Sequence, residues 1–232
     1  TGSDGPLYPP MSTFLADRKI PLATGYDAKN IQPHIWEIQD KFKRPDLIIV
    51  GNAISKTNIE AQAVEELINK DGSVKRMSFA EALASFCIGD RESFVVAGTH
   101  GKTTTTSILT CALESSGSNP GYFIGGIPKN FGKGSRTTSS NCFVSEGDEY
   151  DTAYWDKESK FLHYRPTWVL CTGIEFDHAD IYSSVEAIEN SFLKLVNITK
   201  KGWLLIDKKS APRADSAEKV AKALKEKGIK VF

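Results

Sequence analysis

One segment constrains this chain more than any other, because an apolar run at residues 94–97 leads through a glycine-rich turn directly into a helix. The turn and the start of the helix read Gly98-Thr-His-Gly-Lys-Thr103. Glycines let the backbone N–H groups point toward one anion, and a helix N-terminus adds partial positive charge. The lysine and threonine that begin the helix can contact phosphate oxygens and Mg²⁺, respectively. The segment therefore predicts a polyphosphate site formed by Gly98, Thr99, His100, Gly101, Lys102, Thr103 and Thr104.

This segment departs from the general phosphate-loop pattern G-x-x-x-x-G-K-[ST] in one place. The pattern requires glycine at position 96, where this chain has Val96, and Gly98 follows two residues later. The tripeptide Gly-Lys-Thr is a weak signal by itself, since it could begin a helix that binds nothing. The preceding strand, the following helix and the two glycines around Thr99 and His100 favour the phosphate-binding interpretation.

Acidic and histidine side chains follow two further predicted strands, at residues 142–145 and 167–171. The first strand leads into Glu146-Gly-Asp-Glu-Tyr-Asp151, and the second leads toward His178. In open parallel sheets, the carboxyl ends of the strands form one ligand-binding edge. A solvated acidic loop and a structural histidine are the alternative interpretations. We expect a Mg²⁺ site at this edge that involves Thr103 and Glu146, and a metal or phosphate role for His178.

Short apolar runs alternate with helical patterns along the chain, which indicates an α/β fold with a mainly parallel sheet. Strands are expected at residues 46–50, 91–97, 121–124, 142–145, 167–171, 203–206 and 229–232, and helices at 33–43, 58–70, 78–88, 102–116, 184–199 and 215–227. The polar stretch 71–76 has turn chemistry and is the predicted linker. We therefore expect a partial Rossmann-like domain over residues 1–76 and a phosphate-loop domain over residues 77–232.

The charge balance argues against a general nucleic-acid binder. The chain has 29 basic and 29 acidic residues among 232, a net charge of zero with histidine neutral, whereas nucleic-acid binders normally carry a basic excess. No apolar run approaches the 18 or more residues of a membrane span. Four widely spaced cysteines predict buried free thiols rather than zinc ligands or a disulfide framework. We expect a cytoplasmic protein without nucleic-acid or membrane partners.

The glycine-rich segment, the acidic run and the segment that contains His178 resemble motifs of the Mur ligases, the ATP-dependent amide-forming enzymes of peptidoglycan synthesis. The three motifs also follow one another along the chain in the order found in that family. The glycine-rich segment is similar to their variant phosphate loop, which does not require glycine at the position of Val96. The segments Val144-Ser-Glu-Gly-Asp-Glu-Tyr-Asp151 and Glu175-Phe-Asp-His178 are similar to their acidic and histidine motifs. One departure is Gly173, where the family usually has asparagine. The similarity runs almost from end to end and includes Gly51-Asn-Ala53, Ile124-Gly-Gly-Ile-Pro-Lys-Asn-Phe131 and Ser159-Lys-Phe-Leu-His-Tyr-Arg-Pro166.

The resemblance implies three domains in a complete protein, which bind the UDP-sugar, ATP and the amine substrate in that order along the chain. Residues 1–76 would then be a UDP-sugar-binding domain without its opening strand and glycine-rich turn. Residues 77–232 would be the central ATP-binding domain without its C-terminal end, and the amine-binding domain would be absent. The implied cofactors are ATP and Mg²⁺, and this chain alone is expected to be inactive as a ligase. The resemblance also implies that Thr103 and Glu146 hold a first Mg²⁺ and that Glu146 and His178 hold a second, with Lys102, Glu146 and His178 as the catalytic residues.

Within the family, the chain is most similar to enzymes of peptidoglycan recycling that join UDP-N-acetylmuramate to the murein tripeptide L-Ala-γ-D-Glu-meso-diaminopimelate through an acyl phosphate. One alternative is the related ligase that adds L-alanine to the same nucleotide sugar. Another, from a different class, is a non-catalytic phosphate-loop nucleotide switch. A guanine-nucleotide switch needs an Asn-Lys-x-Asp motif after the loop, whereas Asn69-Lys70 precedes it. The resemblance implies that Ser3, Asp4 and Asn52 contact the uracil and diphosphate of the UDP-sugar. For the sugar-peptide side, the candidates are Asn130, His163 and Arg165.

Overall fold

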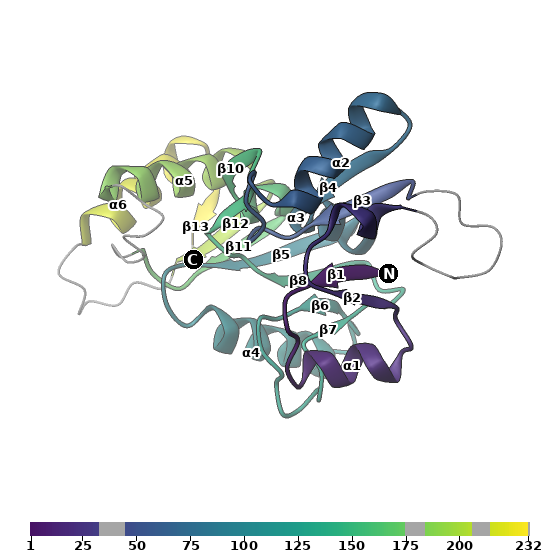
Figure 1. Ribbon diagram of the computed structural model, residues 1–232. Coiled ribbons are helices and arrows are strands. Elements are labelled where there is room, and N and C mark those ends of the chain that lie inside the picture. Colours follow the sequence, from purple (N-terminus) through teal and green to yellow (C-terminus); the bar gives the residue numbers. More distant parts are fainter. Residues whose placement is uncertain (33–44, 175–183, 206–213, 232) are drawn as a thin grey trace. The chain divides into compact units, whose positions relative to one another are not determined.

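A computed structural model describes residues 1–32, 45–174, 184–205 and 214–231 of the chain (Figure 1). The chain divides into two compact units, and each is described by itself. The first contains Thr1–Phe79 and Ala153–Trp155, and the second contains Ala80–Thr152 and Asp156–Phe232. The helix predicted at residues 33–43 lies outside the described residues.

The first unit consists of two parallel strand–helix–strand segments. The strands β1 (Gly2–Asp4) and β2 (Leu22–Thr24) pair with each other and are connected by α1 (Met11–Asp17). The strands β3 (Leu47–Val50) and β4 (Lys75–Ser78) also pair in parallel and are connected in part by α2 (Ile59–Lys70), and a 3-10 turn, η1 (Ala28–Ile31), follows β2. The unit therefore has the strand–helix–strand organisation expected of a partial Rossmann-like domain.

An asparagine caps the start of α2, at the beginning of the helix predicted over residues 58–70. The side chain of Asn58 accepts hydrogen bonds from the backbone N–H groups of Glu60 (2.9 Å) and Ala61 (3.1 Å), which satisfies two of the donors that a helix N-terminus leaves without partners. The predicted linker at residues 71–76 is wrong at its last two residues, because Lys75 and Arg76 belong to β4 and pair with β3. Sheet pairing with a distant strand outweighs the polar, turn-like composition of this stretch.

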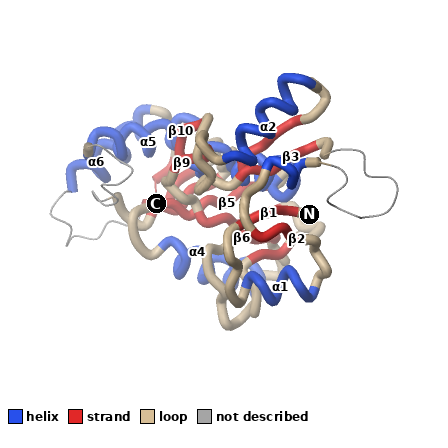
Figure 2. Tube along the Cα trace, viewed as in Figure 1, coloured by secondary structure: helices blue, strands red, loops and turns tan. Residues whose placement is uncertain are grey.

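The second unit is built on a seven-stranded sheet with the order β13-β12-β11-β5-β8-β6-β7. Strands are drawn in red and the helices beside them in blue in Figure 2. Its neighbouring strands are parallel, except that β6 and β7 are antiparallel. The mainly parallel sheet predicted from the sequence is confirmed. The strands are β5 (Glu92–Ala97), β6 (Gly121–Phe123), β7 (Ser135–Arg136), β8 (Cys142–Glu146), β11 (Trp168–Cys171), β12 (Gly202–Leu205) and β13 (Lys230–Val231).

Helical segments connect most of these strands. The segment between β8 and β11 instead contains a pair of short strands, β9 (Asp151–Ala153) and β10 (Asp156–Ser159), and a 3-10 helix, η4 (Lys160–Tyr164). The helix predicted at residues 78–88 is wrong as a single α-helix, because Ser78 ends β4 and the last residues form a π-helix. The helices are α3 (Phe79–Ala82), the π-helical η3 (Leu83–Ile88), α4 (Lys102–Ser115), α5 (Val185–Ile198) and α6 (Ala214–Glu226). Within the described residues, no helix has both the length and the apolar character needed to cross a membrane.

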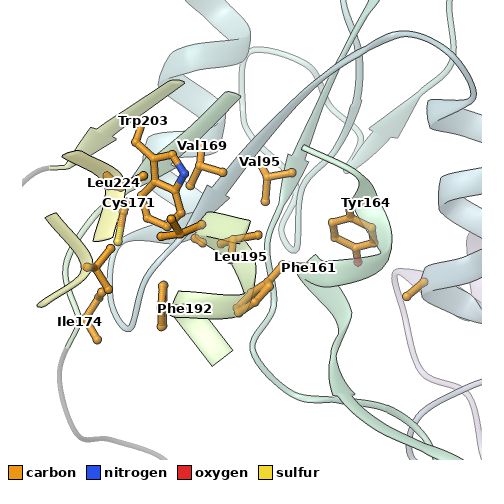
Figure 3. Close-up of a cluster of buried hydrophobic side chains, with 14 of the residues drawn as sticks. Val95, Phe161, Tyr164, Val169, Cys171, Ile174, Phe192, Leu195, Trp203 and Leu224 are labelled. Atoms are coloured by element: carbon orange, nitrogen blue, oxygen red, sulfur yellow. The ribbon is translucent and has the colours of Figure 1, made fainter. Parts of the chain in front are cut away.

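Alternation along the strands places different side chains on the two faces of this sheet. On one face, Val95 and Val169 pack with Leu195 of α5 and Leu224 of α6 in the main buried cluster (Figure 3). On the other face, Val144 packs against partly buried leucines of α4. The sheet is therefore held between helices on both sides.

The strand order makes the carboxyl end of β5 the point where the connections diverge. The chain leaves β5 through α4 to reach β6 on one side, whereas β8 is followed by β11 on the other side of β5. In open α/β sheets, ligands bind at such a switch point, outside the carboxyl ends of the strands. The predicted phosphate loop begins at this position.

Candidate nucleotide-binding site

The phosphate loop, residues 98–101, has a backbone conformation that depends on its two glycines. Gly98 has φ +126° and Gly101 has φ +76°, and L-residues with a Cβ atom rarely adopt such values. Gly101 is the residue that precedes α4. An added Cβ at Gly101 would meet no atom within 4 Å, so this side of the loop is open to an incoming group.

The loop is fixed to the end of β11 by backbone and side-chain hydrogen bonds. The N–H of Thr99 donates to the carbonyl of Gly173 (3.0 Å), and the Thr172 hydroxyl donates to the carbonyl of His100 (2.5 Å). Gly98 lies so close to this segment that an added Cβ would be 2.3 Å from the Thr172 Oγ1 and 2.9 Å from the carbonyl oxygen of Gly173. Glycine at position 98 is therefore required by close packing as well as by φ.

Lys102 is the first residue of α4, and its ammonium group lies among four oxygen atoms. The distances from Nζ are 2.8 Å to the Gly98 carbonyl, 3.2 Å to the Thr99 carbonyl, and 3.0 and 2.8 Å to the two carboxylate oxygens of Glu149. The ammonium is therefore held against the phosphate loop. The first N–H groups of α4 have no acceptor within the helix, and together with Lys102 they make this position favourable for phosphate.

Thr103 and Glu146 lie next to each other, as the sequence predicts for ligands of one metal ion. The Thr103 hydroxyl donates to Glu146 Oε1 (2.8 Å), and the N–H of Gly125 donates to Glu146 Oε2 (2.8 Å). A hydroxyl and a carboxylate are oxygen ligands of the type that Mg²⁺ prefers, so this pair fits the ion. Among the described residues, no three His, Cys, Asp or Glu side chains are grouped to hold a metal. His178, the third predicted ligand, lies outside the described residues.

Lysine side chains partner three of the four acids in residues 146–151, at and after the end of β8. Glu149 contacts Lys102, Asp148 contacts Lys160 (2.7 Å), and Asp151 contacts Lys157 (2.8 Å). These contacts reduce the repulsion that four acids within six residues would otherwise produce. Glu146 instead contacts hydroxyl and amide groups, which is consistent with its predicted role as the metal ligand of this segment.

A cavity of about 810 Å³ lies beside the first turns of α4. It contains the predicted substrate residue Asn130, whose amide lies 3.5 Å from the Cys111 sulfur. The structure thus places Asn130 beside Thr103 and Thr104 of the predicted phosphate site. The residues that line this cavity are Thr103, Thr104, Ser107, Ile108, Cys111, Ile127, Pro128, Lys129 and Asn130.

The other two residues predicted for the sugar-peptide side, His163 and Arg165, make contacts elsewhere in the second unit. His163 Nε2 lies 2.9 Å from a carboxylate oxygen of Asp156. Arg165 donates to the carbonyls of Ala84 (3.1 Å) and Gly89 (3.4 Å), just before the amino end of β5. The six residues of β5 separate this end from the phosphate loop by about 20 Å at about 3.3 Å per residue. The structure does not bring Arg165 to the predicted phosphate site.

One cavity of about 210 Å³ in the first unit is lined by Ser3, Asp4 and Asn52, the residues predicted to contact the uracil and diphosphate of the UDP-sugar. The Ser3 hydroxyl donates to a carboxylate oxygen of Glu60, and the Tyr26 hydroxyl donates to Asp4 (2.9 Å). Partial burial, and then the hydrogen bond to Asp4, raise the pKa of Tyr26 above its ordinary value. The cavity thus presents hydroxyl, amide and carboxylate groups that can pair with a polar ligand.

Two residues that contact the phosphate loop or Lys102 were not assigned roles from the sequence. Glu149 partners Lys102, and Thr172 fixes the loop by its hydroxyl contact with His100. The acidic run contained Glu149, but its place directly after the predicted strand singled out Glu146, and no sequence signal distinguished Glu149 from the other acids. The position of Thr172 directly after a predicted strand is the signal that could have identified it.

Comparisons with known proteins show which family the chain is similar to. A family profile described as the Mur ligase middle domain matches residues 96–232. An Escherichia coli (strain K12) protein named UDP-N-acetylmuramate--L-alanyl-gamma-D-glutamyl-meso-2,6-diaminoheptandioate ligase is 44% identical over 198 residues, which are 85% of this chain and 40% of that protein. An Arthrobacter protein named UDP-N-acetylmuramate--L-alanine ligase is 32% identical, over 89% of this chain and 39% of its own length.

A solved structure is also similar over nearly the whole chain. It is the UDP-N-acetylmuramate:L-alanyl-gamma-D-glutamyl-meso-diaminopimelate ligase from Neisseria meningitides, with a TM-score of 0.80 and 35% identity. The match covers 97% of this chain and 66% of that one. The chain spans about 40% of the length of the curated relatives that it matches.

Proposed function

The chain belongs to the Mur ligase family, and from this premise we propose that its protein is an ATP-dependent amide ligase. The proposed reaction joins UDP-N-acetylmuramate to L-alanyl-γ-D-glutamyl-meso-diaminopimelate in peptidoglycan recycling. The observation that carries the proposal is the grouping of Lys102, Thr103 and Glu146 at the carboxyl edge of the sheet. This grouping provides a cation, a hydroxyl and a carboxylate where a strand–loop–helix segment can bind a polyphosphate.

The phosphate loop would bind the β- and γ-phosphates of ATP. The open side at Gly101 leaves room for the phosphates, and the first N–H groups of α4 can donate hydrogen bonds to the phosphate oxygens. The Lys102 ammonium would stabilise the charge that builds up on these oxygens as the γ-phosphoryl group is transferred. Positioning and electrostatic stabilisation of this kind supply most of the catalysis in phosphoryl transfer.

Thr103 and Glu146 would hold Mg²⁺, with His178 as a further proposed ligand outside the described residues. When bound, the ion would reduce the repulsion between an anionic nucleophile and the anionic phosphates. Glu146 is oriented for this role by the N–H of Gly125, which occupies its second carboxylate oxygen. Lys102, Glu146 and His178 are therefore the proposed catalytic residues.

In the proposed reaction, one oxygen atom of the substrate carboxylate ends up in the released phosphate. A carboxylate oxygen of UDP-N-acetylmuramate attacks the γ-phosphorus of ATP, the bond to the ADP oxygen breaks, and an acyl phosphate forms. The amine of the tripeptide then attacks the acyl carbon and loses a proton. Phosphate leaves with the oxygen that came from the carboxylate, and the amide remains.

The choice of amine rests on the comparisons. The Escherichia coli relative named for the tripeptide substrate is 44% identical to the chain, whereas the Arthrobacter relative named for L-alanine is 32% identical. A UDP-N-acetylmuramate–L-alanine ligase is therefore the second candidate. We also propose that Ser3, Asp4 and Asn52 contact the uracil and diphosphate of UDP-N-acetylmuramate, and that Asn130 contacts the sugar-peptide side. Because ATP is the co-substrate, we place the reaction in the cytoplasm.

A substrate comparison with the complete protein tests the proposal. Purified protein with ATP, Mg²⁺ and UDP-N-acetylmuramate should release phosphate rapidly with the tripeptide and slowly with L-alanine. A preference for L-alanine would support the second candidate. Nucleotide binding without amide formation with either amine would support the nucleotide-switch alternative and contradict the proposed function.

A further inference from the structure

We propose that Glu149 is the positioning residue for the phosphate-loop lysine, and that it holds the Lys102 ammonium in place while offsetting its charge until the nucleotide binds. This inference rests on the proposed function, because it assigns a role within the same site. Lys102 Nζ lies 3.0 and 2.8 Å from the two carboxylate oxygens of Glu149. The loop after β8 and the first turn of α4 thus meet through this pair.

The ammonium has more oxygen neighbours than protons. A lysine side chain has three N–H donors, and Lys102 faces both Glu149 oxygens together with the carbonyls of Gly98 and Thr99. A phosphate oxygen can therefore bind Lys102 only by sharing or replacing one of these contacts. The carbonyls are fixed in the backbone of the loop, so the Glu149 side chain is the partner that can adjust.

Burial distinguishes this pair from an ordinary surface ion pair. The side chains of Glu149 and Lys102 are 5% and 15% exposed, so solvent and salt screen their attraction only weakly. By comparison, Glu158 and Lys194 form an ion pair in which the side chains are 47% and 53% exposed. Such exposed pairs contribute little to stability, and Glu158 therefore provides a matched control of the same charge.

The other acids of this loop cannot take over the role of Glu149. Asp148 and Asp151 contact Lys160 and Lys157, and Glu146 accepts from Thr103. Within this described loop, Glu149 is therefore the acid placed to set the position and the effective charge of Lys102.

Two opposite effects follow for the nucleotide. A carboxylate beside the ammonium weakens the attraction of the loop for phosphate in the bound ground state. The same carboxylate keeps the ammonium in the position where it stabilises the transferring phosphoryl group. Interactions that favour the transition state over the ground state raise kcat, whereas uniformly tight binding does not. Removal of the charge should thus tighten nucleotide binding and slow turnover.

The test compares Glu149→Gln, Glu149→Asp and the control Glu158→Gln in the complete protein. ADP binding is measured by calorimetry without Mg²⁺, and kcat and KM for ATP are measured with Mg²⁺ and both substrates. Loss of one nearby charge should lower the Kd for ADP about tenfold in Glu149→Gln. Misplacement of the ammonium should lower its kcat about 10- to 100-fold. Glu149→Asp should recover part of kcat with an ADP affinity near wild type, and Glu158→Gln should match wild type in both.

The split between Kd and kcat separates positioning from a merely structural role. Loss of folded protein would reduce kcat and the number of ADP sites together, and it would not tighten binding. ADP binding in Glu149→Gln that is unchanged or weaker overturns the inference, whether or not kcat falls. If wild-type protein binds ADP but forms no amide, the proposed function fails and the Kd comparison still decides the inference. If wild-type protein binds no ADP, both fail.

Discussion

Replacement of Gly98 by alanine tests the packing of the phosphate loop against β11. The new Cβ would be 2.3 Å from the Thr172 Oγ1, and 2.9 Å from both the Thr172 nitrogen and the Gly173 carbonyl oxygen, at φ +126°. Backbone strain and overpacking of about 2 kcal/mol each predict a loss of about 4 kcal/mol in the free energy of unfolding. At about 2–4 °C per kcal/mol for a chain of this size, the Tm falls by about 8–16 °C.

Gly101→Ala is the matched control for this prediction. Gly101 also has a positive φ, +76°, but an added Cβ would meet no atom within 4 Å. Its cost is therefore backbone strain alone, about 1–2 kcal/mol, and its Tm should fall by about 2–8 °C. Thermal unfolding of the 232-residue chain, followed by circular dichroism, compares the two variants. Equal Tm values for Gly98→Ala and Gly101→Ala would refute the close contact between the loop and residues 172–173.

Three further predictions concern single side chains. In the complete protein, Lys102→Ala should lower the ligation rate by about 10²- to 10³-fold, and a rate near wild type would remove the phosphate loop from the mechanism. The same variant leaves Glu149 buried without its ammonium partner. Adding Glu149→Gln to it should therefore recover stability but not activity. Glu146→Gln should raise the Mg²⁺ concentration needed for half-maximal ligation, whereas Glu158→Gln should not, and equal effects would mean that the acidic run is only a solvated loop. Burial raises the pKa of Cys171 to about 12, so iodoacetamide at pH 8 should modify this thiol only after the protein unfolds. Mass spectrometry measures the modification, and alkylation of Cys171 in the folded protein would contradict its burial.

The phosphate loop could be predicted from sequence because its requirements are local. A buried strand, two glycines and a lysine-threonine helix start all lie between residues 94 and 104, and the structure places them at the switch point of the sheet. The caps and faces of long helices are local in the same sense, and Asn58 is found where its type and position predict. Short-range chemistry of this kind needs no knowledge of the fold.

The residues that were missed depend on contacts between distant parts of the chain. Lys102 and Glu149 are 47 residues apart, and only the pairing of β5 with β8 brings them together. Strand β1 is Gly-Ser-Asp, which has no apolar pattern and forms a strand through its pairing with β2. The contacts of Arg165 with the carbonyls of Ala84 and Gly89, before the amino end of β5, likewise follow from the path of the chain between β10 and β11. Sequence patterns do not specify such paths.

The oxygen balance of the proposed reaction provides the most direct test of its central claim. UDP-N-acetylmuramate labelled with ¹⁸O in its carboxylate is incubated with the complete protein, unlabelled ATP, Mg²⁺ and the tripeptide, and the released phosphate is analysed by mass spectrometry. An acyl phosphate formed at the Lys102 loop predicts one ¹⁸O atom in each phosphate released with the amide product. Phosphate without ¹⁸O would show that the carboxylate never attacked the γ-phosphorus, and it would contradict the mechanism proposed for this site.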